Sequence, residues 1–342
     1  MKPIEKILVR MPNWIGDLVM ATPILSDLRS AFPAASITAM CLSPICKLLE
    51  KDSSIDELFC FTRPSNKFSR RQEKRDIIAK IQAGNYDVGI LLTNSFSSAW
   101  WFWQAGIPIR IGYPKHWRRW LLTDSIDFPS EKMHQVNLYK KLLEPLGIPV
   151  SSTAPRLYLT EKEVKESKQL LYQRGYKPGK KLIGINPGAA YGSAKCWPLE
   201  NFRALSEALL KNEEIALVFF GDARTSSLVK KICQGLDERA MNLAGITSLR
   251  ELSCIIKDCN VLITNDSGPM HVGDALGVPL VSLFGSTDDR LTGPYQQSDS
   301  VINKRVSCSP CFKRVCPIDF KCMHEIRVQD VVDAVEKRLN RV

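Results

Sequence analysis

The chain has 342 residues, of which 44% are hydrophobic and 24% are charged. This composition is typical of a globular protein and argues against a disordered, collagen-like or membrane-spanning chain. A chain of this length exceeds what one hydrophobic core usually organises, so we expect two domains. The 47 basic residues outnumber the 36 acidic ones and give a net charge of +11. Such an excess indicates an anionic partner, which could be a nucleic acid, a phosphorylated metabolite or an acidic membrane surface.

The cysteines and the first residues both indicate a cytoplasmic protein. Seven of the eleven cysteines are scattered along the chain and are expected to be reduced and buried. The first ten residues contain Glu5, Lys6 and Arg10 and lack the apolar core of a signal peptide. Residues 88–109 carry no charge over 22 positions, but polar residues interrupt them. A buried strand, a polar loop and a short aromatic helix fit this stretch better than a membrane span.

The first half of the chain alternates predicted strands with predicted helices. The predicted elements are a strand at 6–9, a loop at 11–16, a helix at 17–31, a strand at 36–40, a helix at 71–82 and a buried strand at 88–92. This alternation is the signature of a doubly wound α/β sheet. The polar stretch 150–155 then has the composition of a linker.

The second half repeats the alternation. Strands are predicted at 182–186, 216–220, 261–264 and 280–284, and helices at 199–211, from 225, from 267 and at 328–339. We therefore expect two Rossmann-like domains, residues 1–155 and 156–342, with a cleft between them, which is the GT-B fold. In such folds an amphipathic last helix often packs back across the cleft onto the first domain. Glycosyltransferases, epimerases and binding proteins share this fold, so the fold alone does not decide the function.

The first strand is followed by the sequence NWIGD at 13–17. Gly16 permits a tight turn or the close approach of a ligand, and Asp17 lies where the helix begins, at the carboxyl end of a strand. Two interpretations fit Asp17: a helix N-cap, or a general base that deprotonates an acceptor hydroxyl. The junction has no G-x-G-x-x-G sequence, which disfavours a dinucleotide-dependent dehydrogenase.

In the second half, the sequence TNDSGPMH at 264–271 follows a strand and opens a helix. Backbone N–H groups and the positive end of the helix dipole form a natural phosphate site there. Ser267 can donate to an oxygen, Gly268 removes steric bulk, and Pro269 suits the first helical turn. The alternative is a well-capped helix without a ligand.

A second, glycine-rich loop at 186–198 follows another strand of the same half. Gly188 is a predicted substrate-binding position, and Lys195 suits a diphosphate leaving group; the alternative for Lys195 is a solvated surface charge. Together the two loops would bracket a nucleotide diphosphate, with Asp17 facing them from the other domain. This is the geometry that an inverting sugar transfer needs.

The predicted transfer uses no metal. No D-x-D sequence lies at a strand end, and Asp288-Asp289 is the nearest acidic pair. Lys195 and the helix dipole would then neutralise the charge that Mg²⁺ neutralises in metal-dependent enzymes. No cofactor is expected.

Three motifs carry a resemblance to a known family. W-x-G-D at 14–17, A-K-x-W-P at 194–198 and T-N-D-S-G-x-M-H at 264–271 occur in this order along the chain. They resemble the ADP-heptose:lipopolysaccharide heptosyltransferases, glycosyltransferase family 9, and are most similar to its heptosyltransferase II members. The resemblance implies an inverting transfer of L-glycero-D-manno-heptose from ADP-heptose to the heptose/Kdo inner core of lipopolysaccharide on lipid A, with ADP released.

The same resemblance assigns roles to residues. It implies that Asp17 is the catalytic base and that Lys195 contacts the donor diphosphate. The residues implied around the donor are Asp266, Ser267, Gly268 and His271, with Asp266 holding the heptose hydroxyls. Asp222 follows the predicted strand 216–220, where such folds often place a contact to a ribose. Two alternatives remain open: a glycosyltransferase with another nucleotide sugar or acceptor, and a non-catalytic nucleotide- or lipid-binding protein.

Most of the positive charge lies in one stretch. Between Arg63 and Arg119 there are eleven basic residues, Lys67 among them, against three acidic ones, a net charge of +8. Four tryptophans lie in the same stretch, and a fifth, Trp120, directly follows it. This mixture suits phosphorylated lipid on an anionic membrane. We expect this region to bind the acceptor and to hold the protein at the cytoplasmic face of the inner membrane; the alternative is a solvated helix with core tryptophans. No nucleic-acid module is visible, so no nucleic-acid partner is expected.

The remaining four cysteines form the sequence C-x2-C-x4-C-x5-C, at Cys308, Cys311, Cys316 and Cys322. Spacing of this kind occurs in small structural zinc sites. Reversible disulfides and free thiols are the two alternatives, and the sequence leaves all three open.

Overall fold

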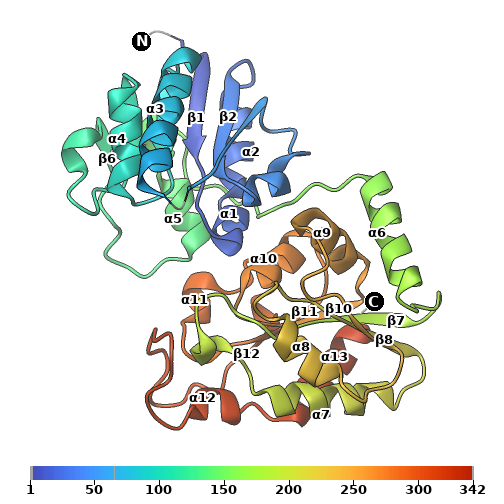
Figure 1. The fold of residues 1–342 in the computed structure, drawn as a ribbon. Helices are drawn as coiled ribbons and strands as arrows, with labels where there is room; N and C mark the ends of the chain where they lie inside the picture. Colours follow the sequence, from blue (N-terminus) through green and yellow to red (C-terminus); the bar gives the residue numbers. More distant parts are fainter. Residues whose placement is uncertain (1–2, 65, 341–342) are drawn as a thin grey trace. The chain divides into compact units, whose positions relative to one another are not determined.

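Two parallel β-sheets of six strands each organise the described residues, 3–64 and 66–340, of the computed structural model (Figure 1). The chain divides into two compact units, Met1–Tyr158 and Leu159–Val342. Each sheet belongs to one unit, and helices connect its strands. The prediction of two doubly wound α/β domains is therefore confirmed in its fold class. None of the helices in the described residues is both long enough and apolar enough to span a membrane.

The first sheet has the strand order β3-β2-β1-β4-β5-β6. Its strands are β1 (Lys6–Arg10), β2 (Ser36–Leu42), β3 (Glu57–Phe61), β4 (Val88–Leu91), β5 (Ile109–Gly112) and β6 (Asp124–Ser125). The winding reverses between β1 and β4, which are neighbours in the sheet. In doubly wound sheets, ligands bind beyond the carboxyl ends of the strands at such a switch point.

The helices of the first unit form two groups. They are α1 (Ile15–Met20), α2 (Thr22–Ala31), α3 (Lys67–Gly84), α4 (Phe96–Gln104) and α5 (Gln135–Lys141), with short 3₁₀ turns at Ile45–Leu49, Arg119–Leu121 and Glu144–Leu146. Helix α3 packs on α4, whereas α1, α2 and α5 pack on one another. Right-handed crossovers place the two groups on opposite faces of the sheet. The uncharged stretch 88–109 forms β4, a loop, α4 and the start of β5, as predicted.

Two features of the first unit differ from the prediction. The helix expected at 17–31 is two helices, α1 and α2, which meet at Ala21. Pro23 explains the break, because it lacks the N–H that a continuous helix would use at that position. Cys46 and Cys60, which were expected to be reduced, form a disulfide.

The second sheet has the order β12-β11-β10-β7-β8-β9, and its switch point lies between β7 and β10. Its strands are β7 (Lys181–Asn186), β8 (Ile215–Phe219), β9 (Ala240–Asn242), β10 (Val261–Asn265), β11 (Leu280–Leu283) and β12 (Val301–Ile302). Its helices are α6 (Glu161–Gln173), α7 (Leu199–Leu210), α8 (Ser226–Cys233), α9 (Leu249–Asp258), α10 (Gly268–Ala275), α11 (Asp289–Thr292), α12 (Lys321–His324) and α13 (Val328–Leu339). Short 3₁₀ turns lie at Ser193–Lys195 and Ser298–Ser300.

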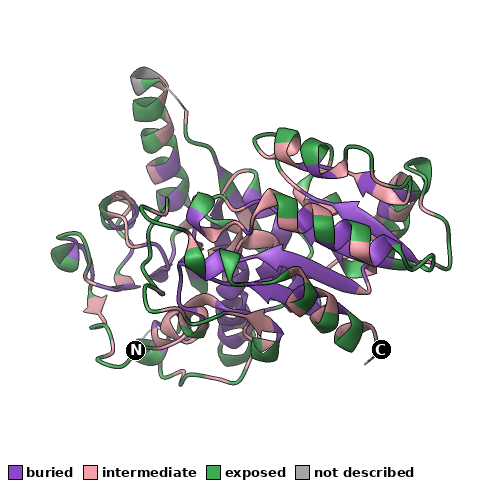
Figure 2. Ribbon diagram, turned by 90° about the horizontal axis from the view of Figure 1, so that it is seen from below, coloured by how far each residue is buried: buried purple, intermediate pink, exposed green. Residues whose placement is uncertain are grey.

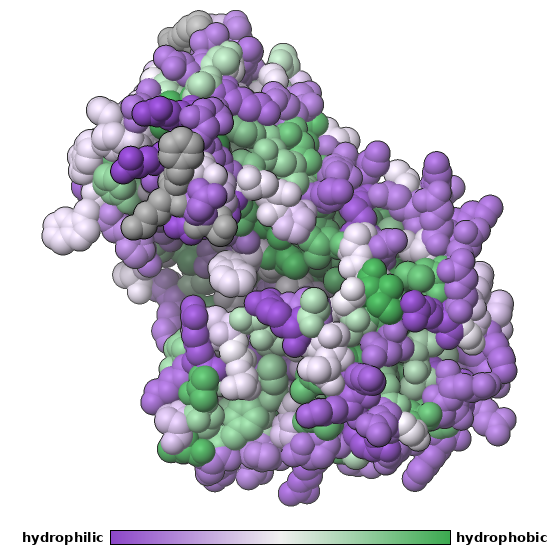
Figure 3. Space-filling view, viewed as in Figure 1, coloured by the Kyte–Doolittle hydropathy of each residue, from purple (hydrophilic) through white to green (hydrophobic). Residues whose placement is uncertain are grey.

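Apolar packing holds each sheet between its helices. In the second unit α7 packs on α8 and α13, and α13 also contacts β10 and β11, while α9 packs on α6 and α10. The strands are buried and most helices keep an exposed face (Figure 2). Hydrophilic side chains cover much of the surface that Figure 3 shows. This arrangement leaves the loops at the carboxyl ends of the strands as the places where polar side chains gather.

Candidate active site

Two buried asparagines join the loops at the switch point of the second sheet. Asn186 at the end of β7 donates its Nδ2 to the carbonyl of Gly188 (3.0 Å) and to Oγ of Ser267 (2.9 Å). Asn265 at the end of β10 donates to the carbonyl of Pro187 (2.7 Å) and accepts a bond from the backbone N–H of Trp197 (3.0 Å). The glycine-rich loop and the start of α10 therefore form one rigid group.

Lys195 lies inside this group as one member of an ion pair. Its Nζ is paired with Oδ2 of Asp266, and the hydroxyl of Thr287 donates to the same carboxylate oxygen (2.6 Å). The ammonium also lies 4.8 Å from the ring centroid of Tyr191. The side chains of Lys195 and Asp266 are only 13% and 5% exposed, so the interpretation of Lys195 as a solvated surface charge is wrong. A fixed cation, a carboxylate and a hydroxyl thus converge at one point.

The start of α10 lies at the same switch point, because its N-cap residue Ser267 is hydrogen-bonded to Asn186 of β7. Ser267 is the N-cap residue, but its side chain makes no capping hydrogen bond. Its hydroxyl instead lies between Asn186 and Oγ1 of Thr264. The Gly268 N–H is therefore not taken by the N-cap side chain. Pro269 has no N–H, and the N–H of Met270 donates to the carbonyl of Ser267 (3.1 Å). The helix dipole adds positive potential at this end. His271 is buried in the following turn.

Thr225 lies against both Gly188 and Asp222. A Cβ built on Gly188 would lie 2.9 Å from Cγ2 of Thr225, so glycine is required there by close packing. The Thr225 hydroxyl and backbone N–H both donate to Oδ1 of Asp222 (3.0 Å each). Desolvation acts to raise the pKa of Asp222, but the hydrogen bonds from Arg224 and Thr225 hold it below its usual value. The structure shows Asp222 in the loop between β8 and α8, and its contact to a ribose stays a prediction.

In the first unit, Asp17 is the third residue of α1. The N-cap residue of that helix is Trp14, so the interpretation of Asp17 as an N-cap is wrong. The hydroxyl of Tyr139, on α5, donates to Oδ1 of Asp17 (3.2 Å). Burial, and after it the negative charge of Asp17, raises the pKa of Tyr139 well above its ordinary value. Tyr139 therefore stays protonated and orients the carboxylate as a hydrogen-bond donor.

A buried arginine fixes the loop that carries Asp17. Arg10 at the end of β1 donates to Oδ1 of Asn13 (2.6 Å) and to the carbonyl of Met40 (3.4 Å). Its guanidinium lies 4.7 Å from the ring centroid of Phe61. Burial lowers the pKa of Arg10 to about 9, which still leaves the side chain charged at neutral pH. The buried, charged side chain of Arg10 thus fixes the loop between β1 and α1 through its hydrogen bond to Asn13.

Sequence reasoning missed five of these side chains: Arg10, Tyr139, Asn186, Asn265 and Thr287. Three of them carried a local signal, because a polar residue ends an otherwise apolar buried strand. Tyr139 and Thr287 carried none, since each reaches its partner from a distant element.

The basic stretch of the first unit separates into exposed and buried parts. Four aromatic rings contact one another in stacked, tilted and edge-to-face pairs, with centroids 4.9–6.3 Å apart: Phe96, Trp100, Trp103 and Trp120. Trp120 is 59% exposed and Trp117 is 92% exposed, so these two are not core residues, whereas Trp101 is buried. The basic side chains of α3 that are exposed are Arg70, Arg71, Lys74, Arg75 and Lys80.

Two of the eleven basic residues need separate treatment. Arg118 is fully buried, and it donates to the carbonyls of Tyr113 (2.8 Å) and Ser95 (3.3 Å). It therefore does not belong to a membrane-facing surface. The side chain of Lys67 lies outside the described residues.

The two doubly wound units, each with polar loops at its switch point, are those of the GT-B class. The structure of Escherichia coli ADP-heptose lps heptosyltransferase II matches with a TM-score of 0.84 at 28% identity, covering 98% of this chain and 99% of that one. A glycosyl transferase family 9 structure from Veillonella parvula matches with a TM-score of 0.87 at 26% identity, covering 99% and 98% of the two chains.

Sequence comparison agrees. Lipooligosaccharide heptosyltransferase 2 of Haemophilus ducreyi is 31% identical over 311 residues, which are 87% of this chain and 88% of that protein. The sequence profile of glycosyltransferase family 9 (heptosyltransferase) matches residues 75–322. The chain belongs to this family.

Proposed function

We propose that the protein is an inverting heptosyltransferase that moves L-glycero-D-manno-heptose from ADP-heptose to the heptose/Kdo inner core of lipopolysaccharide on lipid A. The names of the relatives from Haemophilus ducreyi and Escherichia coli support heptose transfer to such a core. One observation carries the donor half of the proposal. The buried Lys195–Asp266 pair lies at the switch point of the second sheet, beside the start of α10.

On the donor side, the leaving group is a diphosphate. When the bond between C1 of the heptose and the phosphate oxygen breaks, the electron pair leaves with ADP. In the proposal, Lys195, the N–H of Gly268 and the dipole of α10 stabilise that charge. Asp266 accepts hydrogen bonds from the heptose hydroxyls, while the hydroxyl of Thr287 donates to Oδ2 of Asp266 and fixes the orientation of the carboxylate.

On the acceptor side, Asp17 takes the proton of the attacking hydroxyl. The new bond forms between that oxygen and C1 on the face opposite ADP, which inverts the configuration. Tyr139 is a positioning residue, because its hydrogen bond fixes the orientation of the Asp17 carboxylate. General-base assistance of this kind contributes about 10²–10⁴-fold in rate.

The proposal assigns no divalent metal to the transfer. Support comes from the fixed ammonium of Lys195 and from the absence of a D-x-D sequence at a strand end. Turnover measured without added Mg²⁺ or Mn²⁺ tests this point, and a strict requirement for either ion would contradict it.

The experiment that tests the function compares Asp17→Ala with the wild-type chain. ADP release is measured with acceptors that bear no heptose or one heptose, and ADP-heptose competes against UDP- and GDP-sugars. We expect Asp17→Ala to lose turnover by at least about 10²-fold while its affinity for ADP-heptose by calorimetry is unchanged. Glu50→Gln, an exposed carboxylate of the same unit, is the control. Turnover of Asp17→Ala near the wild-type rate would remove the base role, and a preference for another nucleotide sugar would replace the donor.

We also propose that the protein contacts the anionic inner-membrane leaflet peripherally, from the cytoplasm. The contacting surface is the basic–aromatic surface, defined by Phe96, Trp100, Trp103, Trp117 and Trp120 together with the exposed basic residues of α3. Exposed tryptophans suit the lipid interface, and neighbouring basic side chains suit anionic headgroups. The packing of α3 on α4 supports one continuous surface.

A further inference from the structure

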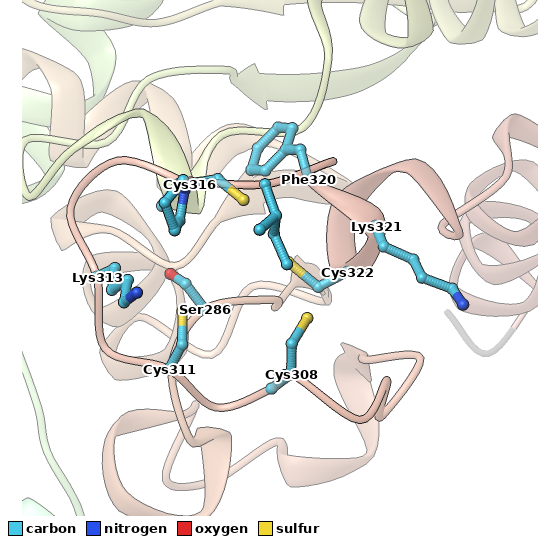
Figure 4. Close-up of a pocket in the computed structure, with 12 residues that line it drawn as sticks. Ser286, Cys308, Cys311, Lys313, Cys316, Phe320, Lys321 and Cys322 are labelled. Atoms are coloured by element: carbon cyan, nitrogen blue, oxygen red, sulfur yellow. The ribbon is translucent and has the colours of Figure 1, made fainter.

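Four cysteines that the proposed reaction does not use converge on one pocket of the second unit. The pocket has a volume of about 220 Å³. Figure 4 shows the side chains of Cys308, Cys311, Cys316 and Cys322 around it. All four are free thiols.

The backbone holds this arrangement on the sheet. The carbonyl of Ser286, just beyond β11, accepts hydrogen bonds from the N–H groups of Cys311 (3.1 Å) and Phe312 (2.7 Å). The Ser286 hydroxyl is buried, lines the pocket and has no hydrogen-bond partner. Cys322 is buried on α12, whereas Cys308 and Cys311 are exposed. The pocket thus has a fixed inner wall and an outer wall that solvent reaches.

We propose that Cys308, Cys311, Cys316 and Cys322 together bind one thiophilic metal ion, Zn²⁺ or iron. A four-sulfur donor set that begins with C-x2-C is the ligand set these ions prefer. No three His, Cys, Asp or Glu side chains of the described residues already lie at metal-ligating spacing. Metal binding therefore draws the sulfurs inward, and the exposed Cys308 and Cys311 are the ligands with room to move.

The chemistry of this step is proton release without oxidation. As four metal–sulfur bonds form, four S–H protons pass to solvent, and no electron is transferred. Metal binding to such a set is coupled to local folding, because the separated thiols do not form a finished site before the ion arrives.

Three contacts connect the segment between the second and third cysteines to the glycine-rich loop 186–198 that carries Lys195. The hydroxyl of Tyr191 donates to the carbonyl of Phe312 (2.8 Å), and the N–H of Ala194 donates to the carbonyl of Arg314 (3.0 Å). A Cβ on Gly192 would overlap the same Arg314 carbonyl. Phe312 and Arg314 lie between the second and third cysteines, so fixing the cysteines fixes the loop that carries Lys195. This consequence rests on the proposed function, whereas the metal site itself does not.

The first experiment measures metal content. The full chain is purified under reducing conditions without chelator, and bound metal is determined by elemental analysis, with the absorption spectrum separating iron from zinc. We expect one metal ion per chain in the wild type and in Cys233→Ser, a half-buried cysteine elsewhere in the same unit. The double variant Cys308→Ser/Cys311→Ser should lose the metal while circular dichroism shows an unchanged fold. Cys316→Ser serves as the second variant if the double variant does not fold.

Three results would overturn the site. They are a wild-type chain that holds no metal and takes up no Zn²⁺ in reducing buffer, a double variant that keeps its metal, and disulfide bonds among the four cysteines of the freshly purified chain. A separate measurement tests the link to the donor loop. Chelation should raise the KM for ADP-heptose, and Zn²⁺ or iron, but not Mg²⁺, should restore it. An unchanged KM would rule out the connection between the metal site and the donor loop, but not the metal site itself. A failure of the proposed heptose transfer would likewise leave the metal site unaffected.

Discussion

At the scale of single residues, the Lys195–Asp266 pair is the feature most open to test. A Lys195→Met variant loses the ammonium and also leaves Asp266 as a buried carboxylate without its cation. Both effects oppose the binding of an anion, so we expect the Kd for ADP by calorimetry to rise by about 10–100-fold, which is about 1.4–2.7 kcal/mol.

The double variant Lys195→Met/Asp266→Asn separates the two effects. Removing the carboxylate charge should recover part of the lost ADP affinity, and the remainder is the direct contribution of the ammonium. ADP affinity equal to that of the wild type in Lys195→Met would contradict a diphosphate contact.

A second prediction at this scale concerns Tyr139. Tyr139→Phe removes the donor that stabilises the charged form of the Asp17 carboxylate, so Asp17 becomes easier to protonate. We expect the acid limb of the pH–kcat profile to move to higher pH by about one to two units, because a hydrogen bond to a charged group contributes about 1.5–3 kcal/mol.

Tyr113→Phe is the matched control for this change. Tyr113 is equally buried in the same unit, and its hydroxyl donates to the carbonyl of Leu138 (2.6 Å) rather than to a carboxylate. A general loss of packing would affect both variants, whereas the pH shift should appear in Tyr139→Phe alone. Equal profiles in the two variants would show that Tyr139 acts only through stability.

The residues that sequence reasoning found and missed differ in a physical way. Asp266 directly follows β10, Lys195 lies in the loop after β7, and Asp17 lies in the first turn of α1 after β1. All three belong to strand-to-helix connections at the carboxyl ends of parallel strands, where functional side chains gather. Tyr139 and Thr287 contact Asp17 and Asp266 only because α5 and the loop after β11 pack beside the elements that carry these two aspartates. No local sequence pattern predicts this tertiary packing. The roles assigned to all the candidate site residues, Asp222 and His271 included, stay predictions.

At the scale of elements, the strong apolar patterns were predictable and the exceptions have local causes. The range 328–339 predicted for the last helix coincides with α13, because its amphipathic pattern is regular. The predicted helix 17–31 failed at Pro23. The two-residue strands β6 and β12 are too short to show any period. Helix α6 was not predicted, although Thr160 and Glu163 form a capping box at its start.

Glu163 also gives a prediction for the stability of this element. Both of its carboxylate oxygens accept bonds from Arg250 on α9, at 2.9 and 2.7 Å. The Arg250 hydrogen bonds, ahead of the opposing desolvation, lower the pKa of Glu163 to about 2. We expect Glu163→Gln to reduce the free energy of unfolding by about 2 kcal/mol at neutral pH, measured by urea denaturation.

The pH dependence of that difference follows from the lowered pKa. The carboxylate contributes its full stability above its ordinary pKa of 4.5 and loses it as the pH falls toward about 2. The gap between the wild type and Glu163→Gln should therefore narrow across this window. Glu251→Gln is the control, because Glu251 caps α9 in the same way through the N–H of Ser248 (2.7 Å). A gap that stays constant down to the lower limit would contradict the ion pair as its cause.

At the scale of the whole molecule, the burial of individual side chains shows which basic residues can face an anionic membrane. The sequence alone could place a charge of +8 between Arg63 and Arg119, but it could not separate exposed cations from structural ones. Arg118 is buried among carbonyls, and burial lowers its pKa to about 10. Arg110 donates to the carbonyl of Leu121 (2.7 Å). What remains for an anionic surface is chiefly α3, next to the exposed aromatic rings of α4.

The basic–aromatic surface predicts membrane binding with two separable components. Vesicles that contain phosphatidylglycerol should sediment with the wild-type chain at low salt, and binding should weaken as salt screens the headgroup charge. Reversing charge in Arg71→Glu/Lys74→Glu should remove most of the salt-dependent part, since each basic residue near an anionic surface contributes about 1 kcal/mol.

The aromatic component should respond differently to salt. In Trp103→Ala/Trp120→Ala the exposed rings are lost while α3 keeps its charge, so we expect weaker binding at every salt concentration and an unchanged salt dependence. Tyr172→Ala, an exposed aromatic of the second unit, should bind as the wild type does. Vesicles of phosphatidylcholine alone show what remains without headgroup charge. If the wild-type chain ignores phosphatidylglycerol vesicles at low salt, or if the tryptophan variant binds as tightly as the wild type, this surface does not contact the membrane.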